Sequence, residues 1–126
     1  MTQDYVAGAC NIGPAEIALR RRTGHAGLAT TAVLAAALIR SDLPRPWRLT
    51  LAIPATGAAA GYLQARSRFC ADFGFRGVYN FGRPTRRPQA QAPTEQARQQ
   101  DRRRALQIGA ASAAIGVGVA VVAWFA

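Results

Sequence analysis

The longest apolar run lies at the C-terminal side of the sequence, from Leu106 to Ala126. These 21 residues contain no charged side chain and follow directly on the charged cluster 101–104. A helix of this length, at about 1.5 Å per residue, matches the roughly 30 Å thickness of a bilayer's hydrocarbon core. Thr94 is a candidate N-cap upstream of this run. The pattern therefore predicts a C-terminal helix over residues 94–126, with a transmembrane span at 106–126.

Two shorter apolar runs occupy residues 25–39 and 49–65. The connection between them contains Pro44 and Pro46, which exclude a continuous helix, so the pattern predicts a transmembrane helical hairpin over residues 25–65. Before the hairpin, Pro14 suits the first position of a helix. Residues 1–24 are expected to form an N-terminal arm and a short interfacial helix that breaks at Thr23 and Gly24.

The sequence changes character after the hairpin. Residues 66–82 mix five aromatic side chains with arginines and glycines, which favours an interfacial loop beyond a helix end near Cys70. Residues 83–93 are rich in arginine and proline and are expected to be an extended linker. The predicted fold is an all-α integral membrane protein, made of a short interfacial helix, a transmembrane hairpin, an aromatic and arginine-rich interfacial loop, and a C-terminal transmembrane helix.

All 16 basic residues are arginine, and the net charge is +10. The arginines flank the apolar runs and lack the interleaved aromatic and polar pattern of a base-reading surface, which argues against a nucleic-acid partner. Ten of them lie between the second and third runs, so this segment should be cytoplasmic, with the N-terminus inside and the C-terminus outside a bacterial inner membrane. The residues expected to contact lipid head groups or a partner are Arg20, Arg21, Arg22, Arg66, Arg68, Arg102, Arg103 and Arg104.

Small residues recur at helical spacing within the apolar runs. Gly57 and Gly61 form a GxxxG pattern, which allows close approach of helix backbones. Ser112, Gly116 and Ala120 form a similar ridge on the C-terminal helix. These positions are predicted helix-packing sites, either within the chain or against another subunit.

Few residues could carry chemistry. His25, the only histidine, could ligate haem or a pigment, but no second axial ligand is evident and an interfacial imidazole is favoured. Cys10 and Cys70 are a candidate thiol site, since Arg66 and Arg68 near Cys70 would favour a thiolate. Alternatively, both cysteines are reduced and packed against aromatic rings. No metal-ligand spacing, catalytic triad or phosphate loop is present, so neither a cofactor nor an enzymatic activity is expected.

The segment that runs from Asn11 and Gly13 through Glu16 and Arg20, then two short apolar runs, to Cys70 resembles the small two-helix inner-membrane domain found alone or fused to rhodanese sulfurtransferases. The resemblance covers residues 10–74 and implies a helical hairpin that tends to self-associate. The chain has no rhodanese domain and adds a third apolar run, so sulfur chemistry is not implied.

Taken together, these patterns favour a non-enzymatic small membrane subunit that stabilises or assembles a larger respiratory or photosynthetic complex. The alternatives are a thiol-active membrane protein that uses Cys10 and Cys70, and a lipid organiser that binds anionic lipids through its arginines.

Overall fold

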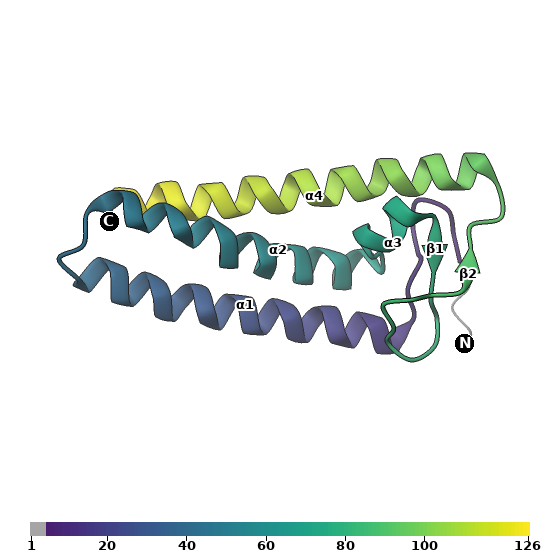
Figure 1. The fold of residues 1–126 in the computed structure, drawn as a ribbon, viewed down its shortest axis with the longest axis horizontal. Coiled ribbons are helices and arrows are strands. Elements are labelled where there is room, and N and C mark those ends of the chain that lie inside the picture. The colour runs from purple at the N-terminus through teal and green to yellow at the C-terminus, as the bar shows by residue number, and fades with distance from the viewer. Residues whose placement is uncertain (1–4) are drawn as a thin grey trace.

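The computed structural model describes residues 5–126 and is mostly helical, with a small two-stranded sheet. The first four residues of the expected arm lie outside this range. Helix α2 lies between α1 and α4 and packs against both (Figure 1). The elements are α1 (Pro14–Arg40), the 3-10 helix η1 (Arg45–Leu51), α2 (Ala52–Ser67), α3 (Ala71–Arg76), β1 (Val78–Tyr79), β2 (Ala90–Gln91) and α4 (Glu95–Trp124).

Helix α1 is continuous over 27 residues, so the expected break at Thr23 and Gly24 is wrong. The Thr23 hydroxyl donates to the Leu19 carbonyl within the helix. Gly24 packs against the ring of Tyr62 on α2, where an added Cβ would lie 2.8 Å from a ring carbon. This tertiary contact keeps α1 helical at Gly24, although glycine has a low intrinsic helix propensity.

The two helices of the expected hairpin are present, with different bounds for the second, but within the described residues neither is long and apolar enough to cross a membrane. The segment after Pro44 forms η1, and α2 begins at Ala52 rather than at residue 49. Helix α2 ends at Ser67, not near Cys70, because Arg68 adopts a left-handed conformation with φ of 54°. This turn directs the chain back toward the first turn of α1.

The region expected to be an interfacial loop, residues 66–82, instead contains α3 and β1. Its aromatic side chains do not all face outward: Phe69 and Phe73 are fully buried. Phe69 packs against Ala105 and Ile108 of α4. The expected linker is also partly ordered, because its residues 90–91 pair with β1 in antiparallel register, and the fold is therefore not purely α-helical.

Helix α4 confirms the expectation of one helix that continues into the last apolar run. The Thr94 hydroxyl accepts a 3.0 Å hydrogen bond from the Ala97 amide, as an N-cap should. Within residues 5–126, α4 is the one helix long and apolar enough to cross a membrane, and only 28% of its most apolar window is buried. A core helix of a water-soluble protein would be mostly buried, whereas most of this window is exposed.

Small residues allow the helices to approach closely, as predicted for Gly61 and for the ridge on α4. A Cβ at Gly61 would lie 2.5 Å from the Gly24 amide nitrogen on α1. Ser112, Gly116 and Ala120 are all buried, and Gly116 faces Ala52 and Thr56 of α2. Gly57 does not take part in this packing, because it is exposed and a Cβ there would meet no atom within 4 Å.

Candidate functional site

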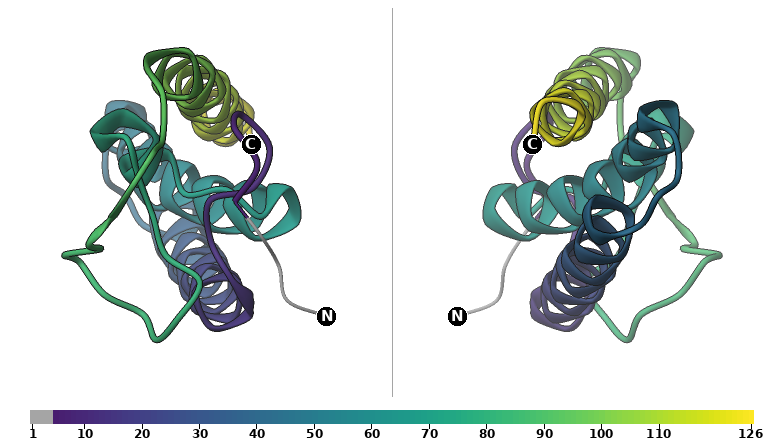
Figure 2. Two further views of the ribbon diagram at one scale, coloured as in Figure 1. Left: turned by 90° about the vertical axis from the view of Figure 1, so that its right-hand side faces the viewer. Right: turned by 90° about the vertical axis from the view of Figure 1, so that its left-hand side faces the viewer.

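Charge is concentrated at one end of the bundle. Thirteen of the 16 arginines lie in residues 5–23 and 66–104, which we call the basic end, and the other three are Arg40, Arg45 and Arg48. Figure 2 shows, in its left-hand panel, the irregular segments that cover this end. At the far end, Arg48 donates from Nη1 to the carbonyls of Ala123 and Ala126 at 3.0 and 2.7 Å, and so caps the C-terminus of α4.

Asn11 ties the N-terminal arm to the turn after α2. Its side chain is fully buried and pairs with both backbone groups of Cys70. Asn11 Nδ2 donates to the Cys70 carbonyl at 3.0 Å, and the Cys70 backbone amide donates to Asn11 Oδ1 at 2.6 Å. Its own amide donates to the Arg68 carbonyl, and its carbonyl accepts from the Asn80 amide. One residue therefore satisfies polar groups from two segments that lie far from it in the sequence.

Glu16 is the buried anion of the basic end, with 1% of its surface exposed. Its Oε1 accepts from Asn80 Nδ2 at 3.0 Å and from the Thr85 amide at 2.9 Å. Its Oε2 forms a 3.1 Å ion pair with Arg20 Nη1. The same guanidinium donates from Nη2 to Cys70 Sγ at 3.1 Å. A continuous polar chain thus runs from Thr85 through Glu16 and Arg20 to the thiol.

The cation beside Cys70 is Arg20, and not Arg66 or Arg68 as the sequence suggested. Arg66 and Arg68 are exposed and make no side-chain hydrogen bond with the part of the chain described. Sequence distance concealed this contact, because Arg20 and Cys70 are 50 residues apart and meet only when α1 and α2 form the hairpin.

Both cysteines are reduced and buried. Cys10 is 8% exposed and its thiol lies 3.7 Å from the Ile12 carbonyl, while Cys70 is 2% exposed and packs with Ile12 and Phe73. This arrangement favours the packed-thiol alternative. Across residues 5–126, no group of three or more histidine, cysteine, aspartate or glutamate residues could hold a metal ion.

His25 lies on the exposed side of α1, where its Nδ1 is 2.6 Å from the Tyr62 hydroxyl of α2. The two rings also meet edge to face, with centroids 5.3 Å apart. The imidazole therefore has a protein partner in the hairpin.

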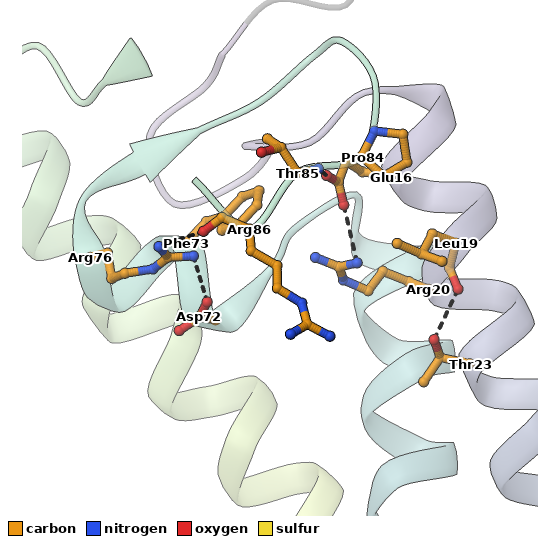
Figure 3. A pocket seen from close by; sticks show the side chains of 10 residues that line it. All are labelled: Glu16, Leu19, Arg20, Thr23, Asp72, Phe73, Arg76, Pro84, Thr85 and Arg86. Atoms are coloured by element: carbon orange, nitrogen blue, oxygen red, sulfur yellow. Dashed lines mark hydrogen bonds and ion pairs between the residues drawn. The ribbon is translucent and has the colours of Figure 1, made fainter. Parts of the chain in front are cut away.

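A polar pocket of about 470 Å³ opens beside the Glu16–Arg20 pair (Figure 3). Its walls come from three segments: the first turns of α1, helix α3, and residues 84–86. Arg76 forms a 2.6 Å ion pair with Asp72 and also donates to the Arg86 carbonyl. The Arg86 side chain extends into the space between Asp72 and Arg20.

Sequence reasoning missed a buried carboxylate in the charged start of α4. Asp101 has no exposed surface and accepts from the Tyr5 hydroxyl at 2.6 Å and from the Gly8 amide at 2.7 Å. Burial, together with this hydrogen bond and the negative charge of Asp101, raises the pKa of Tyr5 well above its ordinary value. The only signal in the sequence is that Asp101 is the single acid in a run of arginines and glutamines.

The basic end therefore gathers five of the residues on which the resemblance rests: Asn11, Gly13, Glu16, Arg20 and Cys70. It also adds partners that the sequence did not single out, among them Asn80, Arg76, Arg86 and Asp101. No known family, curated protein or solved structure matches this chain.

Proposed function

We propose that the chain is a small integral membrane protein of a bacterial inner membrane, without catalytic activity of its own, which packs against a larger membrane complex and stabilises it. One observation carries the membrane placement. Large apolar side chains are exposed on all three long helices, as at Leu28 in α1 (55%), Ile53 in the first turn of α2 (77%) and Val122 in the last turn of α4 (71%). Many large apolar side chains exposed on one small protein favour contact with lipid or with another protein.

The distribution of charge supports the same placement. Thirteen arginines at the basic end against three at the far end match the positive-inside rule, with the basic end in the cytoplasm. In this arrangement α4 is a full span. The apolar parts of α1 and α2 lie beside it as a hairpin, and the C-terminus is outside the cytoplasm.

Outward-facing small residues support a protein partner. Gly57, Gly109 and Gly118 are exposed, and a Cβ at any of them would meet no atom within 4 Å. Ala110 and Ala114 are exposed on the same helix as Gly118. Small side chains gain little from lipid contact but permit close approach of another helix. The partner is accordingly a transmembrane helix of another subunit, which lies against the outer face of α4.

Affinity purification of the tagged chain from membranes in mild detergent tests this proposal. Gly118→Leu should reduce the yield of co-purified partner, because the added side chain separates two backbones. Ala26→Leu, an equally exposed position on α1, is the matched control and should not reduce the yield. Equal yields for both variants would contradict a partner on this face of α4. Recovery of the untagged chain in the soluble fraction would contradict the membrane placement.

A thiol function is the second candidate, and the 3.1 Å contact between Arg20 Nη2 and Cys70 Sγ is the observation that favours it. The contact places a cationic donor directly at the sulfur. If the thiol is functional, Cys70→Ser should abolish activity while the chain still assembles with its partners. If the cysteines only pack, the Cys10→Ser, Cys70→Ser double variant should assemble and function as the wild type does.

A further inference from the structure

The pocket at the basic end has one positive charge that its own residues do not neutralise. It contains three guanidinium groups and two carboxylates. Glu16 is paired with Arg20, and Asp72 is paired with Arg76. The remaining guanidinium, that of Arg86, is exposed and makes no ion pair or hydrogen bond with any residue from 5 to 126. The unbalanced charge therefore lies inside the pocket, where Figure 3 shows the Arg86 side chain.

Thr85, which supplies a neutral donor, also lines this pocket. The Thr85 hydroxyl accepts from the Arg87 amide at 3.0 Å, so its own proton is available to a ligand. Guanidinium groups bind phosphate oxygens through charge-assisted hydrogen bonds, and a hydroxyl is a further donor. A phosphodiester, with a single negative charge, matches the single unbalanced positive charge.

A separate apolar groove lies further along α1. It has a volume of about 490 Å³ and is lined by Ala29, Thr30, Val33, Leu34 and Ala37. Leu19 and Thr23, which line the polar pocket, lie on the same face of α1 as Thr30 and Ala37, since steps of three, four and seven residues return to one side of a helix. From Thr23 to Ala37 the helix rises by roughly 20 Å, which is close to the length of an acyl chain.

We infer that this face of α1 binds one anionic phospholipid. Its phosphodiester lies in the pocket between Arg86 and Arg20, and an acyl chain lies in the groove along α1. The inference rests on the proposed membrane placement. It extends that proposal, because it assigns a specific lipid site rather than general attraction between arginines and head groups. The polar pocket and the apolar groove lie on one face of α1, an arrangement that favours a lipid phosphodiester over free phosphate.

Native mass spectrometry of the purified chain, titrated with phosphatidylglycerol in detergent, tests the inference. The wild type should retain one phosphatidylglycerol in preference to phosphatidylcholine. Arg86→Gln should weaken this binding about tenfold, since it removes a charge-assisted contact. Arg87→Gln is the matched control, because it removes the neighbouring exposed charge outside the pocket, and its affinity should stay within about twofold of wild type.

A second pair of variants tests the groove. Ala37→Phe fills the groove and should weaken retention of phosphatidylglycerol, whereas Ala114→Phe, at an exposed position on α4, should not. Equal loss for Arg86→Gln and Arg87→Gln would overturn the specific site in favour of diffuse attraction. Displacement of the lipid by millimolar inorganic phosphate would overturn the lipid assignment in favour of a free anion. A chain that fractionates with membranes yet retains no phosphatidylglycerol would refute this inference alone, whereas a chain absent from membranes would refute the proposed function.

Discussion

Replacement of Gly61 by alanine should destabilise the hairpin, although alanine is the better helix former. A Cβ at this position would lie 2.5 Å from the Gly24 nitrogen, 2.7 Å from the Arg20 carbonyl oxygen and 2.8 Å from the Gly24 Cα. All three atoms belong to the backbone of α1, so no side chain can rotate away. Helices α1 and α2 must separate to admit the methyl group.

The expected magnitude follows from two opposing terms. Alanine gains about 0.5–1 kcal/mol over glycine inside a helix. Overpacking costs about 1–3 kcal/mol, and contacts with backbone atoms belong in the upper part of that range. The free energy of unfolding should therefore fall by about 1–2 kcal/mol, which corresponds to a melting temperature lower by about 5 °C in a chain of this size.

Gly57→Ala is the matched control, one helical turn away on the same helix. A Cβ at Gly57 meets no atom within 4 Å, so only the gain in helix propensity remains and the melting temperature should stay equal or rise. Thermal unfolding of the detergent-solubilised variants, followed by far-UV circular dichroism, provides the measurement. The reasoning is refuted if Gly61→Ala melts at or above the wild type, or if both variants lose stability equally.

Three further outcomes are expected. Gly116→Ala should detach α4 from α2 and lower the melting temperature, since its Cβ would collide with Thr56, whereas Gly118→Ala should not. Arg48→Gln should increase hydrogen exchange in the last turn of α4, because the carbonyls of Ala123 and Ala126 lose their donor; unchanged exchange would argue against this capping role. Because the pKa of Tyr5 is raised in the folded state, its contribution to stability is complete below the unfolded value of about 10 and is lost as pH rises above it. Tyr5→Phe should remove this alkaline dependence from the unfolding free energy.

The sequence predicts the helices well where periodic apolar patterns and local capping determine the structure. The hairpin, the continuous C-terminal helix with its Thr94 N-cap, and the buried ridge of Ser112, Gly116 and Ala120 all follow from residues close together in the chain. These features depend on helix periodicity and backbone hydrogen bonds.

The basic end was not predictable in the same way, because its contacts join distant segments. Glycines and aromatics in residues 66–82 indicated a loop, but Phe69 and Phe73 become buried once α4 and the N-terminal arm cover them. In the GxxxG pattern, spacing alone could not distinguish Gly61, which faces α1, from Gly57, which faces outward. That distinction depends on how α2 is rotated against its neighbours, which is a tertiary property.

The hydrogen bond between Tyr5 and Asp101 has a consequence for the order in which the chain folds during synthesis. Its two partners are separated by 96 residues, and Gly8 and Asp101 by 93. Loop-closure entropy makes such distant contacts slow to form compared with contacts between neighbouring helices. Tyr5 and Gly8 therefore lack this partner until Asp101, in the second turn of α4, has been synthesised. A chain that stops before residue 101 keeps the contacts of Asn11 with the turn after α2 but leaves the start of the arm, at Tyr5 and Gly8, without its partner.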